Sequence, residues 1–107
     1  MKIEVRGPTF SGSEALRSHA ERRLGSALGR FDAYVLRATV RLSDQNGPRG
    51  GVDQRCHVSL TVKGPGRTRA IELDERSDDA YAALDRAADR VGETLARAVT
   101  RGRRARG

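Results

Sequence analysis

The chain has 107 residues, a formal net charge of +7 and a single cysteine, and these properties limit what it can be. A chain of this length forms one domain, residues 1–107, and its aromatic content of 4% requires a core of small aliphatic side chains. One cysteine excludes an internal disulfide, and no signal peptide or apolar run of roughly 20 residues is present. We therefore expect a cytoplasmic protein whose positive charge favours nucleic acid or another anionic surface as its partner.

The first 31 residues predict a short strand followed by a helix. Residues Lys2–Arg6 alternate in polarity until Gly7 and Pro8 end the pattern, which is typical of a strand. Either Ser11 or Ser13 then caps a helix, and we expect Gly25 and Gly29 to weaken its second half. The apolar positions of this helix recur at helical spacing: Leu16, Ala20, Leu24, Ala27, Leu28 and Phe31.

Three further strands are predicted from strict alternation, at Val35–Leu42, Gln54–Lys63 and Arg67–Leu73. The turn Gly64–Gly66 is short enough to join the last two in an antiparallel hairpin. Residues 43–53 contain many turn formers and no period, so we expect a mobile loop there. In the first of these strands the alternation assigns four residues to the core: Leu36, Ala38, Val40 and Leu42.

A second, longer helix is predicted from Ser77, as its N-cap, towards Arg106, with a basic tail over residues 102–107. Apolar residues from Ala80 to Val99 cover one side of this helix, including Tyr81. The opposite side carries five arginines within a sector of roughly 60°: Arg86, Arg90, Arg97, Arg101 and Arg104.

The order β-α-β-β-β-α predicts an α/β two-layer sandwich, in which a four-stranded mixed sheet carries both helices on one face. The outer faces of the two helices then merge into one basic surface. The first helix adds Arg22 and Arg23 to it.

No pattern of side chains predicts an enzyme, a cofactor, a metal site or a small-molecule substrate. Cys56 and His57 are adjacent on a strand, so they point to opposite faces and cannot form a nucleophile–base pair. We expect Cys56 in the core and His57 on the wet face, with His19 on the solvated side of the first helix. Three carboxylates at helical spacing are expected to pair with surface arginines of the same helix: Glu93 with Arg97, and Asp85 or Asp89 with Arg90.

The arginine row has both a structural and a functional explanation. Basic residues at the end of a helix complement its dipole, so the arginines from residue 97 onwards can form a solvated helix end. The row begins earlier, at Arg86, and the first helix adds arginines of its own, which favours binding of a polyanion. Because aromatic residues are few, we expect contacts to phosphates and shape rather than to stacked bases, and hence salt-sensitive binding.

Two other functions stay open on the residues alone. A shape-reading module for double-stranded RNA shares the α-β-β-β-α core order. A protein-interaction module would instead use the wet face of the strands, which carries Arg37, Thr39, Arg41, His57 and Thr61.

Two segments of the chain resemble one protein family. SEALRSHAERRLGSALGRFD (Ser13–Asp32) resembles the first helix of the bacterial ribosome hibernation promoting factor and sigma-54 modulation protein family. DDAYAALDRAADRVGETLARAV (Asp78–Val99) resembles its second helix, which opens with D-x-Y-x-A-I-D. The matching positions here are Asp79, Tyr81, Ala83, Leu84 and Asp85.

The resemblance implies a stress factor that binds the small ribosomal subunit in its decoding channel through ribosomal RNA. There it would block mRNA and tRNA and silence translation. By matched position Arg23, Arg90, Arg97 and Arg101 are the leading RNA contacts, and Arg22, Arg86 and Arg104 follow from the arginine row. The chain would be monomeric off the ribosome.

The chain also departs from the family. Ser26, Glu93 and Val99 stand where basic residues are expected, and the segment 43–53 is longer than usual. The sequence resembles a short form, which lacks the extra C-terminal domain that pairs ribosomes in the long forms, so the resemblance does not imply that this chain dimerises ribosomes.

Overall fold

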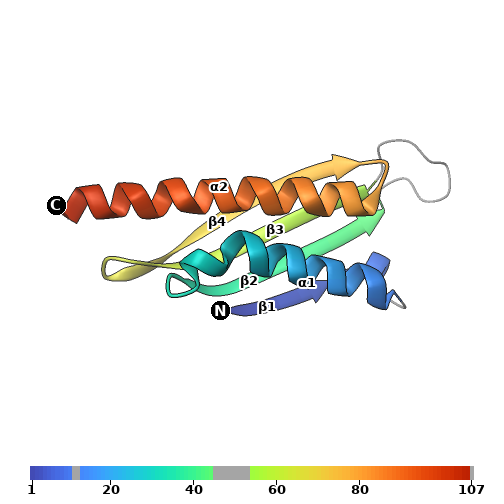
Figure 1. Ribbon diagram of the computed structural model, residues 1–107, viewed down its shortest axis with the longest axis horizontal. Helices are drawn as coiled ribbons and strands as arrows, with labels where there is room; N and C mark the ends of the chain where they lie inside the picture. Colours follow the sequence, from blue (N-terminus) through green and yellow to red (C-terminus); the bar gives the residue numbers. More distant parts are fainter. Residues whose placement is uncertain (11–12, 45–53, 107) are drawn as a thin grey trace.

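The computed structural model describes residues 1–10, 13–44 and 54–106, with side chains as far as Arg101 (Figure 1). Two short 3-10 helices, η1 and η2, flank the first α-helix. The elements follow one another as β1 (Lys2–Arg6), η1 (Pro8–Phe10), α1 (Glu14–Leu28), η2 (Gly29–Phe31), β2 (Val35–Asp44), β3 (Gln54–Gly64), β4 (Arg67–Ser77) and α2 (Ala80–Arg106).

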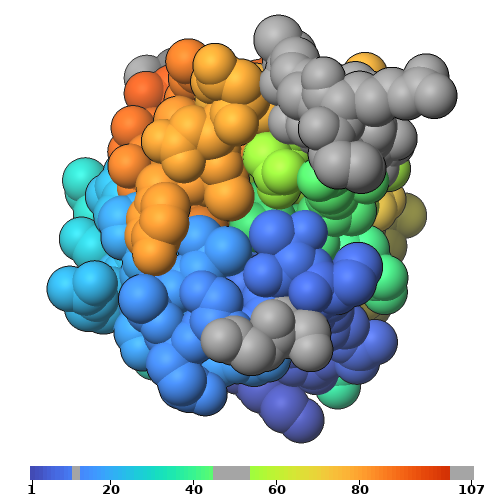
Figure 2. Space-filling view, turned by 90° about the vertical axis from the view of Figure 1, so that its right-hand side faces the viewer, coloured from blue at the N-terminus to red at the C-terminus, as the bar shows by residue number. Residues whose placement is uncertain are grey.

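The four strands form one sheet in the order β1-β2-β3-β4. β1 is parallel to β2, because α1 crosses over between them, and the other two pairs are antiparallel. Both helices cover the same face of the sheet (Figure 1). The end-on view in Figure 2 shows α1 in blue and the start of α2 in orange as one layer beside the green strands. The predicted mixed sheet and two-layer sandwich are therefore confirmed.

The core lies between these two layers and is built mainly from aliphatic side chains. Phe10, Leu24, Leu60 and Leu95 are each at most 2% exposed, and they come from η1, α1, β3 and α2. Cys56 is fully buried among them, as its position in the alternation predicted. The elements are thus held by apolar contacts that join residues distant in the sequence.

The two helices begin at different kinds of cap. Of the two serines that could cap α1, Ser13 does so, because its Oγ accepts a hydrogen bond from the amide of Leu16. The predicted cap of α2 at Ser77 is wrong. β4 continues through Ser77, whose buried Oγ instead accepts from the amide of Asp79, and α2 starts at Ala80. Asp79 takes the capping role, since its carboxylate accepts from the amide of Tyr81 at 3.1 Å.

Two apolar positions were assigned wrongly. Leu36 is 42% exposed, because a register shift between Val35 and Arg37 moves it off the core face and buries Val35 in its place. Tyr81 is 40% exposed and packs its ring edge-to-face against His19 at 4.9 Å. The error at Leu36 arises where a bulge interrupts the alternation, whereas Tyr81 lies in regular helix beside His19 of α1.

Several element ends also differ from the prediction. β2 includes Ser43 and Asp44, so only residues 45–53 of the expected loop lie outside the described part of the chain. The helix α2 continues through Arg106, so most of the expected tail, 102–106, is helical backbone. The first α-helix ends at Leu28, and the chain continues as a 3-10 turn from Gly29, where weakening was expected.

Candidate nucleic-acid interface

The two helices run side by side in the same direction, but they differ greatly in length. α1 has 15 residues and α2 has 27, which correspond to roughly 22 Å and 40 Å of helix. They pack closely at Gly92, where an added Cβ would lie 3.1 Å from the carbonyl oxygen of Ala27. Since α1 ends one residue after Ala27, the part of α2 beyond Gly92 extends past α1 towards the β3–β4 turn (Figure 1).

A network of ion pairs joins the first half of α2 to α1. The Nε of Arg23 lies 2.9 Å from Asp85, and its Nη2 lies 2.7 Å from Asp89. The Nε2 of His19 lies 2.7 Å from the same oxygen of Asp85. The hydrogen bonds that Arg23 donates to Asp89 and, to a smaller extent, to Asp85 raise its pKa above the ordinary value. Arg23 is therefore a fixed bridge between the helices, and its side chain is 32% exposed.

Asp85 lies at the centre of this network. Partial burial alone would raise the pKa of its carboxyl group, but the hydrogen bonds from His19 and Arg23 outweigh burial and hold the pKa below its ordinary value. The expectation that His19 is a solvated residue is wrong, because it packs between Asp85 and the ring of Tyr81. Asp85 and Asp89 do pair with arginine, although the partner lies on the other helix. The expected pairing of Glu93 is not seen among the described residues.

Two arginines of α2 turn towards strand β4. The guanidinium group of Arg86 donates to the backbone carbonyl of Arg76 at 3.3 Å. Arg90 lies 3.1 Å from the carboxylate of Glu75 and donates to the carbonyl of Asp74. We expected Arg90 to pair with Asp85 or Asp89. That expectation is wrong, because both carboxylates pair with Arg23 of α1. Arg86 and Arg90 remain exposed while they hold α2 on the edge of the sheet.

Arg22, Arg97 and Arg101 differ from these arginines. All three are exposed, and no carboxylate of the described residues makes an ion pair with any of them. Arg97 and Arg101 lie one turn apart on the part of α2 that extends beyond α1. The side chain of Arg104 is outside the described residues, although its backbone continues the same helix.

The wet face of the sheet is charged but largely paired within itself. Glu4 pairs with Arg37 and Arg6, and the hydrogen bond from Arg6 lowers its pKa. Asp74 accepts from Arg55 and from His57 at 2.9 Å each, and the hydrogen bond from Arg55 is the main cause of its lowered pKa. His57 lies on the wet face as expected, and acidic side chains of β4 flank its ring on both nitrogens.

The sequence prediction identified the cations and acids of the helices but not how they pair. His19 and Arg23 are four residues apart, as are Asp85 and Asp89, and this matched spacing on two helices is the signal for the bridge. Among the described residues, no group of three or more histidine, cysteine or acidic side chains could hold a metal ion. No helix within the described ranges is long and apolar enough to cross a membrane.

The chain matches one protein family over nearly its whole length. Residues 3–103 match the family described as Sigma 54 modulation protein / S30EA ribosomal protein. Two curated relatives are the chloroplastic ribosome-binding factor PSRP1 of Spinacia oleracea and the ribosome hibernation promotion factor of a Picosynechococcus strain. The first is 30% identical over 79% of this chain and 28% of its own length. The second is 24% identical over 89% of this chain and 47% of its own length. The chain thus spans less than half the length of both.

Solved structures agree with this assignment. The N-terminal domain of Protein Y from Thermus thermophilus is 28% identical, with a TM-score of 0.64 over 91% of this chain and 98% of that one. A ribosomal subunit interface protein from Coxiella burnetii shares the fold, with a TM-score of 0.69 and 22% identity over 94% and 99% of the two chains. The present chain belongs to the Sigma 54 modulation protein / S30EA ribosomal protein family.

Proposed function

We propose that this protein is a ribosome-associated factor that binds the small ribosomal subunit at its decoding channel, where it blocks mRNA and tRNA and silences translation. The observation that carries the proposal is the pair Arg97 and Arg101, exposed without a carboxylate partner among the described residues, on the free end of α2. Guanidinium groups of this kind bind phosphate through two parallel hydrogen bonds. Membership of the family and the ribosome-related names of the relatives support the same partner.

The arginines of the interface have different tasks in this proposal. Arg22, Arg97 and Arg101 supply phosphate contacts, because acidic side chains of the described chain do not neutralise them. Arg104 is assigned to the same task by its place in the arginine row. Arg23, Arg86 and Arg90 are fixed by hydrogen bonds to Asp85, Asp89 and β4, so their remaining exposed N–H groups contact RNA from a pre-set position. A rigid row of cations loses little side-chain entropy when it binds the RNA backbone.

The test is co-sedimentation of the purified protein with small subunits, large subunits and duplex RNA over a series of salt concentrations. We expect selective binding to small subunits that weakens as salt rises, because phosphate contacts release counterions. Equal binding to duplex RNA would instead indicate the double-stranded RNA module. Absence of RNA-dependent binding would instead favour the protein-interaction module that uses the sheet face.

The position in the decoding channel needs its own measurement. Small subunits loaded beforehand with mRNA and tRNA should bind the protein at least about tenfold more weakly than empty subunits, because the same path is occupied. Undiminished binding to loaded subunits would place the protein elsewhere on the subunit and remove the proposed way of silencing translation.

A further inference from the structure

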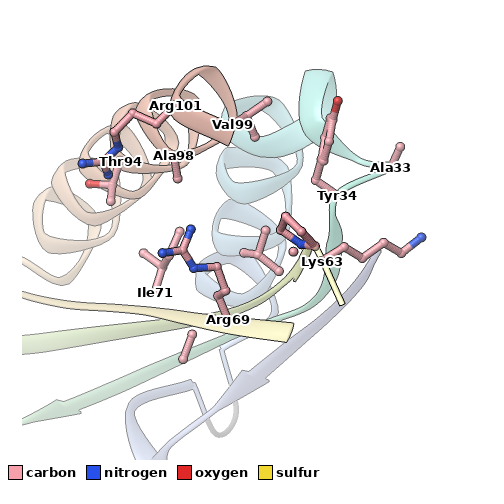
Figure 3. A pocket seen from close by; sticks show the side chains of 13 residues that line it. Ala33, Tyr34, Lys63, Arg69, Ile71, Thr94, Ala98, Val99 and Arg101 are labelled. Atoms are coloured by element: carbon pink, nitrogen blue, oxygen red, sulfur yellow. The ribbon is translucent and has the colours of Figure 1, made fainter. Parts of the chain in front are cut away.

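A pocket of about 560 Å³ lies beneath the free end of α2, beside the basic row (Figure 3). Its walls come from α2, from the β3–β4 hairpin and from the connection between η2 and β2. The apolar lining includes Val62 and Ile71 from the sheet and Ala98 and Val99 from the helix. Tyr34 stands at one end, opposite Arg69 and Arg101.

The pocket follows from the unequal lengths of the helices. α1 stops at Leu28, so none of the described α-helices lies beside α2 over the β3–β4 hairpin. The side chains that α2 contributes to this space are small, namely Thr94 and Ala98, and they leave it unfilled. Its volume lies within the roughly 300–1,000 Å³ that is usual for sites that bind small organic groups.

The charge of the pocket has one sign. Three cationic residues contribute to its lining, namely Lys63, Arg69 and Arg101, and no acidic residue does. Within the described residues none of these three cations forms an ion pair. Arg69 rises from β4 towards α2 and Arg101 lies along the helix above it, whereas Lys63 points outwards (Figure 3). An apolar slot with an aromatic ring at one end and two guanidinium groups at the other suits a planar apolar group that carries an anion.

We infer that this pocket receives a single unpaired nucleotide of the RNA bound by the arginine row, with its base against Tyr34, Ile71 and Val99 and its phosphate at Arg69 and Arg101. This inference rests on the proposed function. Arg101 belongs to both the row and the pocket, so an RNA backbone that follows α2 passes the mouth of the pocket. Recognition of RNA commonly takes up unstacked bases against aromatic side chains.

The variant Ala98→Phe tests the assignment, because it fills the pocket without changing any charge. Ala15→Phe is its matched control, since Ala15 is exposed near the start of α1, at the other end of the molecule. Arg69→Gln removes the phosphate contact while keeping the shape of the pocket. Thermal unfolding of each variant shows whether it is folded before binding is measured.

Small subunits saturated with wild-type protein or Ala15→Phe should show one base newly protected from base-specific chemical probes. With Ala98→Phe at saturation that protection should be lost, while protection of the neighbouring backbone stays. Affinity should fall roughly 5- to 150-fold, which corresponds to the loss of one stacked base. Arg69→Gln should weaken binding and keep the base protection. An unchanged base footprint with folded Ala98→Phe overturns the inference while the proposed function stands.

Two further experiments distinguish a nucleotide of the bound RNA from other occupants of the pocket. A photoreactive group on Thr94→Cys, in the α2 wall of the pocket, should crosslink to ribosomal RNA, and crosslinking to a ribosomal protein overturns the inference. Adenosine 5′-monophosphate at micromolar concentration should not displace the protected base, and full displacement would assign the pocket to a free nucleotide. If wild-type protein does not bind small subunits at all, the proposed function itself has failed.

Discussion

Arg23 on α1 and Asp89 on α2 are 66 positions apart in the sequence, yet the Nη2 of Arg23 lies 2.7 Å from the carboxylate of Asp89. Together with the bond from the same guanidinium group to Asp85, this contact fixes how the two helices lie against each other. The arginine row therefore rests on a helix pair that is held by charge at one end and by close packing at Gly92.

We predict that Arg23 and Asp89 are energetically coupled. In a double-mutant cycle with Arg23→Met and Asp89→Asn, urea unfolding should give a coupling free energy of about 0.5–1 kcal/mol, since the pair is partly exposed. Arg22→Met, the exposed neighbour, should change the free energy of unfolding by less than about 0.5 kcal/mol. A coupling of zero would mean that the bridge does not stabilise the helix pair.

The stability of the protein should fall in acid, partly because of Asp85. Its pKa is held below the ordinary value in the folded state, so the stabilisation is present above the unfolded pKa of about 3.9 and is lost as the pH falls through the folded pKa. Asp85→Asn should therefore reduce the slope of the unfolding free energy between about pH 5 and pH 3. Asp74 and Glu4, whose pKa values are also lowered, keep part of the slope.

The control for this titration is Arg22→Ala, which should keep the wild-type dependence on pH. A slope for Asp85→Asn that equals the wild-type slope would show that the carboxyl group titrates alike in the folded and unfolded states.

Periodicity was enough to predict most of the fold, because each strand and helix buries one face. Alternation in β3 and the helical spacing in α2 depend only on which side meets the core. Leu36 escaped the prediction because a bulge changes the side of the strand on which it lies. The cap at Ser77 was predicted wrongly because Ser77 pairs with Gln54 and so remains part of β4. Sheet pairing outweighs the local preference of serine for a helix cap.

The candidate site was harder to predict than the fold. Arginine spacing locates a basic face, but it does not show which of the arginines form ion pairs within the protein. The partners of Arg23 and Arg90 depend on the distance between the helices and on the course of β4, which are tertiary properties. The pocket beside Arg101 results from where α1 ends relative to α2, and no motif marks it.

Two glycines of the helices should respond differently to alanine. Gly25 has nothing within 4 Å of an added Cβ, so Gly25→Ala should raise the free energy of unfolding by about 0.5–1 kcal/mol through helix propensity. At Gly92 the new methyl group would press on the backbone of Ala27. Chemical denaturation should therefore place Gly92→Ala at least about 0.5 kcal/mol below Gly25→Ala. Equal gains at both sites would show that the helices separate at little cost.

Cys56 should be nearly inert in the folded protein. Its burial, aided by the nearby charges of Asp74 and Glu75, raises the pKa of the thiol to about 12, so little thiolate forms at neutral pH. A thiol reagent at about pH 8 should label it more than about 100-fold more slowly than in the urea-unfolded chain. In the control variant Ala70→Cys the new cysteine lies on the surface and should react rapidly. Rapid labelling of native Cys56 would contradict its place in the core.

The central claim is that the exposed arginines on the free end of α2 bind ribosomal phosphates. Its most direct test is the affinity for small subunits as a function of salt, compared between wild type and Arg97→Gln/Arg101→Gln. The matched control is Arg37→Gln/Arg41→Gln on the sheet face. We expect the α2 variant to bind more weakly and to lower the slope of log affinity against log salt by about 1.4–1.8, the loss of two phosphate contacts. Wild-type affinity and slope in that variant, or an equal loss in the sheet-face control, would contradict the account.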